Sequence, residues 1–189
     1  MSVDLNKAGQ TLTETGYDGK FKVHINCPIN GMFQTIDVSD GTEKVIIKNT
    51  IINLENIKLG TNQGAFMAKK RLDDMTFNLV FENCAVINAN LGNYGSGFIG
   101  AFNTTNSTKN DEFNITFKNC YAHIIKLQNI TYLNTGFIGR KCPYNIYIYN
   151  CYVYNENSKK ISGFTANPLN TVYIYNSITI LTASNSRAY

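Results

Sequence analysis

Two pairs of neighbouring acidic residues, Asp73-Asp74 and Asp111-Glu112, are the first candidates for chemistry in this sequence. Two carboxyl groups that face one cleft about 5–10 Å apart can cleave a glycosidic bond, one as acid and the other as base or nucleophile. Each pair stands on a polar loop before an apolar run, so the pairs would meet only if both loops left the same edge of adjacent units. Neighbouring acids on a loop are usually just solvated. We therefore expect no catalytic residues and a protein that is not an enzyme.

Histidine and cysteine offer little more for catalysis or metal binding. The only histidines, His24 and His123, form neither a metal-binding pair nor part of a local catalytic triad. Cys84, Cys120 and Cys151 each directly follow an Asn, so we expect three buried thiols stacked at the strand spacing of about 4.8 Å. Such thiols usually behave as small hydrophobic groups, and a soft-metal site or a disulfide between units is the alternative. We expect no cofactor and no metal.

Tyrosine is the most suggestive residue type on the expected surface. Four tyrosines alternate with Ile or Val just before two asparagines: Tyr147, Tyr149, Tyr173 and Tyr175. We expect them to form a two-by-two patch on an outer face, extended by Tyr152 and Tyr154. The patch is either a cross-strand ladder that stabilises the sheet or a surface that binds a partner protein or a sugar.

A repeated segment positions all of these residues. Apolar residues stand two and four positions before an Asn in VIIKN, LVFEN, ITFKN, IYIYN and VYIYN, which end at Asn49, Asn83, Asn119, Asn150 and Asn176. Strict alternation predicts short strands with one buried face. Asn tolerates a left-handed backbone, and its amide can bond the next Asn, so we expect the five asparagines to form a ladder at a turn.

A second repeated element lies between these strands. It reads AFMA at 65–68, GFIG at 97–100, GFIG at 136–139 and GFTA at 163–166. We expect its phenylalanines to form an inner stack, with the small flanking residues allowing close approach of the backbone. The phenylalanines are Phe66, Phe98, Phe137 and Phe164.

Repeats of this length and pattern predict an all-β protein, a right-handed parallel β-helix (a solenoid) of about five to six coils. Residues 45–182 would form the β-helix repeats of a single domain. Residues 1–44 would form an N-terminal cap and an irregular first coil, because Val23 and Ile25 are one position out of phase with the repeat. Residues 183–189 would be a polar C-terminal tail.

The pairing of G-F-I-G with N-C-Y, at 97–100 with 119–121 and at 136–139 with 150–152, resembles the GLUG-type repeat. Over residues 64–180 the chain resembles the pectin-lyase-like β-helix superfold. The Gly that usually follows N-C-Y in that repeat is missing here. The resemblance implies a spacer or binding face such as large surface proteins and adhesins contain. Enzymes of this fold have clustered Asp residues on one outer face, a feature that this chain lacks.

Composition restricts the function further. The net charge is +4, and the 17 basic residues are scattered apart from the cluster Lys69-Lys70-Arg71. Because phosphate binding requires a row of cations, we expect no nucleic-acid binding. No apolar run approaches the ~20 residues of a membrane span, and the polar N-terminus predicts no signal peptide and synthesis in the cytoplasm.

Three functions follow as expectations. Free thiols and many residues with A/T-rich codons favour a structural component of a virion, associated with the capsid, that assembles with itself or with other structural proteins. A carbohydrate-binding or adhesin-like module that uses the tyrosine face is the alternative. A polysaccharide-active enzyme is third.

Overall fold

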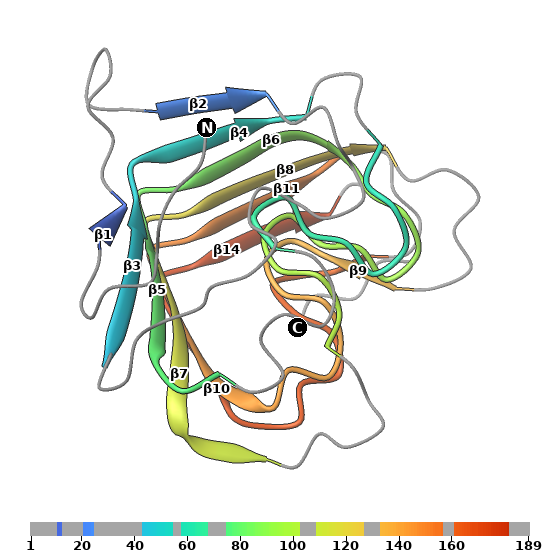
Figure 1. Ribbon diagram of the computed structural model, residues 1–189. Helices are drawn as coiled ribbons and strands as arrows, with labels where there is room; N and C mark the ends of the chain where they lie inside the picture. The colour runs from blue at the N-terminus through green and yellow to red at the C-terminus, as the bar shows by residue number, and fades with distance from the viewer. Residues whose placement is uncertain are drawn as a thin grey trace.

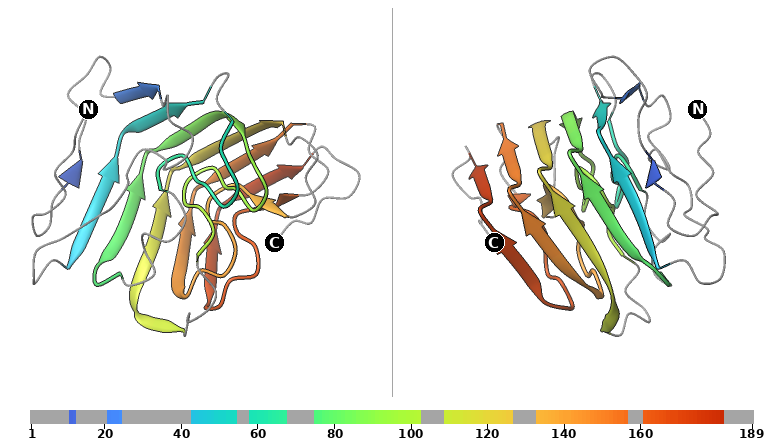
Figure 2. Two further views of the ribbon diagram at one scale, coloured as in Figure 1. Left: turned by 45° about the vertical axis from the view of Figure 1, so that its right-hand side comes forward. Right: turned by 90° about the vertical axis from the view of Figure 1, so that its left-hand side faces the viewer.

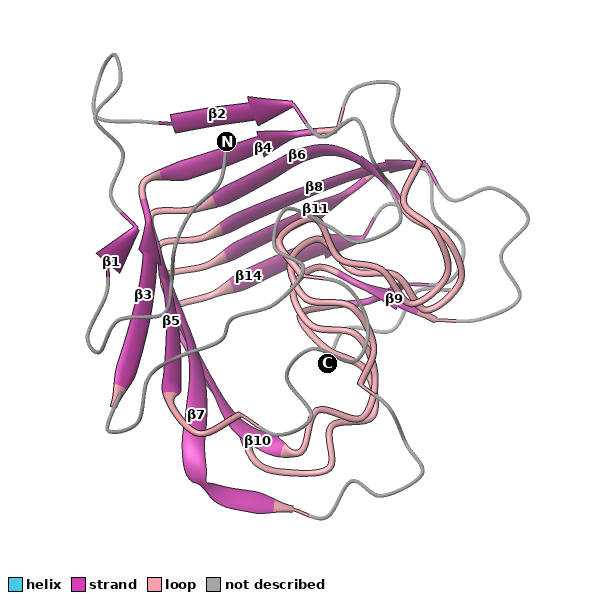
Figure 3. Cartoon of the chain, in the orientation of Figure 1, coloured by secondary structure: helices cyan, strands magenta, loops and turns pink. Residues whose placement is uncertain are grey.

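The computed structural model describes residues 11–12, 21–24, 43–54, 58–67, 75–102, 109–126, 133–156 and 161–181. Every element in these ranges is a β-strand, and every strand pair is parallel. The prediction of an all-β chain with parallel strands is confirmed. Figure 3 shows strands and connecting loops only in the described chain.

Two open six-stranded sheets and one short two-stranded sheet make up the fold (Figure 1). The first sheet has the order β1 (Thr11–Leu12), β3 (Lys44–Lys48), β5 (Asn78–Glu82), β7 (Asn110–Lys118), β10 (Tyr144–Tyr149) and β13 (Val172–Tyr175). The second sheet has the order β14 (Ile178–Leu181), β11 (Tyr152–Asn155), β8 (Tyr121–Lys126), β6 (Ala85–Asn90), β4 (Thr50–Asn53) and β2 (Phe21–His24). The short sheet pairs β9 (Asn134–Thr135) with β12 (Ile161–Ser162).

Each repeat contributes one strand to each large sheet. The chain runs along a strand of the first sheet, bends at an Asn, and continues along a strand of the second sheet. It then passes through the second repeated element, which contains the phenylalanine and which we call the Phe box. Successive copies of the Phe box pair through the bridges Gly64↔Ser96, Met67↔Ile99, Ile99↔Ile138 and Ile138↔Thr165. We call residues 64–67, 96–99, 135–138 and 162–165 the Phe-box stack. Figure 2 shows the strands of successive repeats lying side by side along the molecule.

The alternation read from the sequence matches the burial of the central strands. In β5 the pattern is half-buried, buried, half-buried, buried, half-buried, and β10 alternates in the same way. Inward-facing residues such as Ile47, Phe81 and Ile148 have no exposed surface. The last repeat differs: Ile174 occupies the same register position as Ile148 but is 43% exposed.

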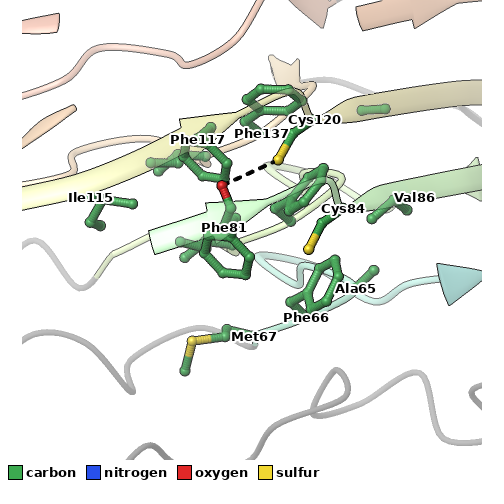
Figure 4. Close-up of a cluster of buried hydrophobic side chains, with 14 of the residues drawn as sticks. Ala65, Phe66, Met67, Phe81, Cys84, Val86, Ile115, Phe117, Cys120 and Phe137 are labelled. Atoms are coloured by element: carbon green, nitrogen blue, oxygen red, sulfur yellow. Dashed lines mark hydrogen bonds between the residues drawn. The ribbon is translucent and has the colours of Figure 1, made fainter. Parts of the chain in front are cut away.

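Two columns of phenylalanine fill the core between the first sheet and the Phe-box stack (Figure 4). Phe81 and Phe117 stack face to face with centroids 5.1 Å apart, and Phe66 and Phe98 stack at 5.0 Å. The columns meet edge to face, because the rings of Phe98 and Phe117 are 85° apart in plane and 5.4 Å apart in centroid. Such pairs add about 0.5–1.5 kcal/mol each beyond the burial of their area.

Close packing of the Phe-box stack requires a residue without a side chain at one position. A Cβ on Gly97 would collide with the backbone carbonyl oxygen of Gly136 in the next repeat. The same two backbones are joined by a hydrogen bond from the Gly97 amide to the Gly136 carbonyl, at 2.9 Å. Glycine therefore lets the two repeats approach to hydrogen-bonding distance.

The bend between the two sheets is made by asparagine in a left-handed conformation. All five repeat asparagines have φ between 45° and 54°. Asn83 donates its side-chain N–H to the amide oxygen of Asn49 at 3.1 Å, Asn119 donates to Asn83 at 3.1 Å, and Asn150 donates to Asn119 at 3.3 Å. The ladder joins four consecutive repeats at the corner.

The residue after each Asn carries a hydrogen-bond donor as well as being small. Its γ atom donates to the carbonyl oxygen two residues earlier and so closes the bend from inside. The donors are Thr50 at 3.0 Å, Cys84 at 3.4 Å, Cys120 at 3.3 Å, Cys151 at 3.1 Å and Ser177 at 2.7 Å. Thr, Cys and Ser share this donor position, so the variation among the five repeats conserves one hydrogen bond.

The N-terminal strands add an outermost strand to each sheet. Thr11 and Leu12 pair with Ile46 and Ile47 of the first sheet, whereas Val23 pairs with Ile52 of the second. The segment around Val23 is thus equivalent to the strands of the second sheet, which follow the repeat Asn. Its apolar residues therefore do not follow the alternation of the first-sheet strands, which precede that Asn. Asn26, Cys27 and the tail at 183–189 lie outside the described residues.

We predict that the Asn corner has two separable contributions to stability. Asn119→Gly keeps the left-handed backbone and loses the amide ladder, at a cost of about 1 kcal/mol. Asn119→Ala also forces an alanine into a left-handed conformation, which adds about 1–2 kcal/mol. Chemical denaturation measures both free energies of unfolding. Asn145→Ala, on the same face but outside the corner, is the control, and equal values for the Gly and Ala variants would contradict the prediction.

Candidate functional site: two aromatic faces and a groove

The outer face of the first sheet carries four tyrosine rings in parallel planes. Tyr147 stacks on Tyr173 with centroids 4.7 Å apart and planes 9° apart, and Tyr149 stacks on Tyr175 at 4.9 Å and 6°. Tyr147 and Tyr149 lie 6.4 Å apart, also with parallel planes. Register pairing of β10 with β13 causes this, because it places each Tyr of one strand directly beside a Tyr of the next. We call these four residues the first-sheet tyrosines.

The environment of Tyr147 favours the protonated form of its phenol. Loss of contact with water raises the pKa of Tyr147, and the neighbouring hydroxyls of Tyr173, Tyr149 and Tyr175 raise it further, because a phenolate would repel a second one nearby.

Tyr152 and Tyr154 form a separate patch instead of extending the first-sheet tyrosines. The bend at Asn150 carries the chain from β10 to β11, so the two residues lie on the second sheet. There Tyr152 stacks on Tyr121 at 5.4 Å, and Tyr154 stacks on His123 at 5.3 Å.

Sequence reasoning missed Tyr121 and His123 as members of this second aromatic face, although they alternate after Asn119 as Tyr152 and Tyr154 do after Asn150.

His123 also contacts a carboxylate. Its Nε2 lies 3.3 Å from Oε2 of Glu156 on the neighbouring repeat, and the two side chains are 21% and 46% exposed. A polar contact between side chains as exposed as these contributes little to stability, whether or not it is ionic. His123 is therefore a half-buried member of the aromatic face with one acidic neighbour.

A groove of about 700 Å³ lies on the outer face of the first sheet beside the tyrosines. This volume falls within the range of about 300–1,000 Å³ that is usual for small-ligand sites. Residues of four adjacent strands, the residue just before β3 and two corner asparagines line it: Glu43, Lys44, Asn78, Val80, Asn114, Thr116, Lys118, Asn119, Tyr147, Tyr149 and Asn150. The groove brings amide, hydroxyl, ammonium and aromatic groups together.

Only one of the two acidic pairs lies in the described chain. Asp73 and Asp74 lie outside the described residues. Asp111 and Glu112 are exposed at the start of β7, and the carboxylate of Asp111 accepts a hydrogen bond from the Asn170 side chain at 2.7 Å. This bond, together with one from Asn170 to the carbonyl of Asn110 at 3.1 Å, fastens β7 to the loop before β13. Asp111 thus has a structural contact.

The described cysteines are buried free thiols. Cys84, Cys120 and Cys151 lie in successive repeats just inside the Asn corner, and the backbone N–H of Cys120 donates to the sulfur of Cys151 at 3.4 Å. Cys120 also donates to the carbonyl of Phe81 at 3.5 Å (Figure 4). Burial is the main reason that the pKa of Cys120 is raised, so its thiol stays protonated. Among the described residues, no group of three or more His, Cys, Asp or Glu could hold a metal ion.

No protein-family model, no curated protein and no solved structure matches this chain. In the ranges that the structure describes, no helix is long and apolar enough to cross a membrane.

The buried thiol of Cys142 predicts a loss of stability at high pH. Burial raises its pKa from the ordinary value of 9.0 to about 12. The protonated thiol donates weakly to the carbonyl of Tyr144 at 3.8 Å. Above pH 9 the unfolded thiol ionises while the folded thiol keeps its proton. The free energy of unfolding should therefore fall by up to about 1.4 kcal/mol per pH unit until the pH reaches the folded pKa.

Cys142→Ala removes this thiol, so the stability difference between wild type and variant should shrink from pH 9 towards pH 12. Denaturant unfolding at several pH values measures it. Val153→Ala, a core truncation without a titrating group, should differ from wild type by the same amount throughout. A constant difference for Cys142→Ala would contradict the prediction.

Proposed function

We propose that this protein is a non-enzymatic structural component, folded as a right-handed parallel β-helix of about five to six coils, that assembles with a second copy through its C-terminal end. The path of the chain supports the fold proposal. Successive repeats pair in parallel in both large sheets and in the Phe-box stack, so each repeat rests on the one before it.

The observation that carries the assembly proposal is the distribution of exposed apolar residues. The exposed large hydrophobic residues of the described chain all lie on β13 and β14: Tyr173, Ile174, Tyr175, Ile178 and Ile180. Ile178 reaches 59% exposure, although the equivalent position one repeat earlier is the half-buried Tyr152. Concentration of such residues in one place is typical of a protein–protein contact surface.

The backbone at this end supports the same proposal. β13 and β14 are the last strands of their sheets, and within the described residues no strand pairs with their outer edges. Unpaired edge strands invite pairing with another chain. Ile174 occupies the inward-facing register position of Ile148, but among the described residues only one neighbouring repeat covers it. A second copy placed against this end would bury it as Ile148 is buried.

The symmetry of the contact would determine the size of the assembly. Two C-terminal ends that meet around a two-fold axis give a closed dimer, whereas a C-terminal end that meets an N-terminal end gives an open fibre. Both arrangements suit a structural component of a larger particle. That the larger particle is a virion is a further proposal, and it rests on residue composition alone.

We predict that the mass measured by light scattering rises above the monomer value of 21.2 kDa as protein concentration increases. Ile178→Thr with Ile180→Thr keeps β-branched residues on β14 and removes apolar surface, so it should weaken association by about tenfold or more. Circular dichroism checks that the fold is unchanged.

Ile51→Thr is a matched control, because Ile51 occupies the same row of the second sheet towards its other end. It should associate like the wild type. A wild-type protein that stays monomeric at every concentration would overturn the proposal of self-assembly.

A further inference from the structure

We propose that the groove on the first sheet binds an oligosaccharide, with one sugar ring stacked on the free faces of Tyr147 and Tyr149 above Thr116. The proposal does not rest on assembly through the C-terminal end, because it uses a different surface. The groove lies on the outer face of β5, β7 and β10, whereas the assembly surface lies on β13 and β14.

The orientation of the rings gives the groove a flat aromatic wall. Tyr173 and Tyr175 cover one face of Tyr147 and Tyr149, and the planes of all four rings are nearly parallel. Because β10 lies between β13 and β7, the opposite faces of Tyr147 and Tyr149 point towards β7. Both residues line the groove on that side.

The tyrosine stack ends at β10, because the next strand of the sheet, β7, carries no tyrosine. This leaves a vacant place for one more ring beside Tyr147 and Tyr149. Thr116 pairs with Tyr147, and Lys118 pairs with Tyr149. Thr116 is much shorter than a tyrosine and lies on the floor of the groove next to Val80. The existing rings repeat at 4.7 and 4.9 Å, the spacing of the strands themselves. A ligand ring placed over Thr116 would continue the stack by one step.

Polar groups around this place are already oriented by hydrogen bonds. Asn78 accepts two bonds from Asn114, from its backbone N–H at 3.0 Å and its side chain at 3.1 Å. At the opposite margin, Asn150 donates one amide N–H to Asn119. A side-chain amide has two N–H donors, so the ladder leaves a second donor on Asn150 for a ligand hydroxyl. Fixed side chains lose little rotational freedom when a ligand binds.

The chemistry of the lining favours a sugar over a nucleic acid or an apolar peptide. Sugars present hydroxyl groups that both donate and accept, and flat C–H faces that pack on aromatic rings. The lining offers amides, the hydroxyls of Thr116, Tyr147 and Tyr149, and one carboxylate, with Lys44 and Lys118 as its only cations. A nucleic acid would require a row of cations along its phosphates. An apolar peptide would leave most of these polar groups without partners.

The test uses cellohexaose, xylohexaose and a hexamer of a uronic acid, titrated into the full chain while backbone amide NMR signals are recorded. We expect at least one of them to bind and to shift signals from β5, β7 and β10. Thr116→Tyr should fill the vacant place with a fifth ring and weaken binding about tenfold or more, without loss of thermal stability. Tyr147→Ala should also weaken binding, because it removes part of the aromatic wall.

Two matched variants separate a ring-stacking site from a general effect of tyrosine loss. Tyr147→Phe keeps the aromatic face, and its dissociation constant should lie within about threefold of the wild-type value. In binding free energy, that is less than half of the effect of a tenfold change in dissociation constant. Tyr152→Ala removes a tyrosine from the second sheet and should bind normally. The proposal is overturned if none of the three sugars binds at millimolar concentration, if the shifts lie on the second sheet, or if Thr116→Tyr binds as well as the wild type. Tighter binding of oligothymidylate or of a peptide would overturn it too.

Discussion

Parallel register at the strand spacing is the constraint on which this structure depends. Apart from the register shifts at Tyr144/Asn145 and within β6, residues of the two large sheets lie directly beside their equivalents in the next repeat, about 4.8 Å away. Each such position must hold a residue type that tolerates its own copy as a neighbour. Phenylalanine, asparagine and isoleucine satisfy this requirement and form the core columns and the corner ladder. A charged residue does not, and the outer row changes sign at each step through Lys48, Glu82 and Lys118.

The corner of each repeat divides two tasks between adjacent residues. Asn adopts the left-handed backbone and joins repeats along the axis, whereas the next residue closes the bend within its own repeat. Thr, Cys and Ser serve equally in the second role because each has a donor at the γ position. The three stacked thiols are therefore explained by local hydrogen bonding, with no requirement for redox or metal chemistry.

A stack of repeats creates two kinds of surface, the sides and the end, and we propose a different use for each. Sides are built from residues that neighbouring repeats support: the stacked tyrosines and the amides of the groove are held by contacts between repeats. Among the described residues no further repeat lies beyond β13 and β14, and this end exposes apolar side chains such as Ile174 and Ile178. Assembly at the end and sugar binding on the side are compatible, because neither covers the other.

The sequence by itself determined the strands, the Asn turn, the buried phenylalanines and the parallel stacking, because each depends on alternation and spacing within one repeat. Only the tertiary structure decided which outward residues meet. Tyr152 follows Tyr149 by three residues but lies on another sheet, since the left-handed bend at Asn150 intervenes. The vacant place above Thr116 depends on a contrast between adjacent repeats, and Asp111 is held by Asn170, which lies 59 residues away. The local sequence pattern predicts the backbone conformation within one repeat. Contacts between unlike side chains depend on the strand register and on the path of the loops, and neither can be read from repeats whose spacing varies from 26 to 36 residues.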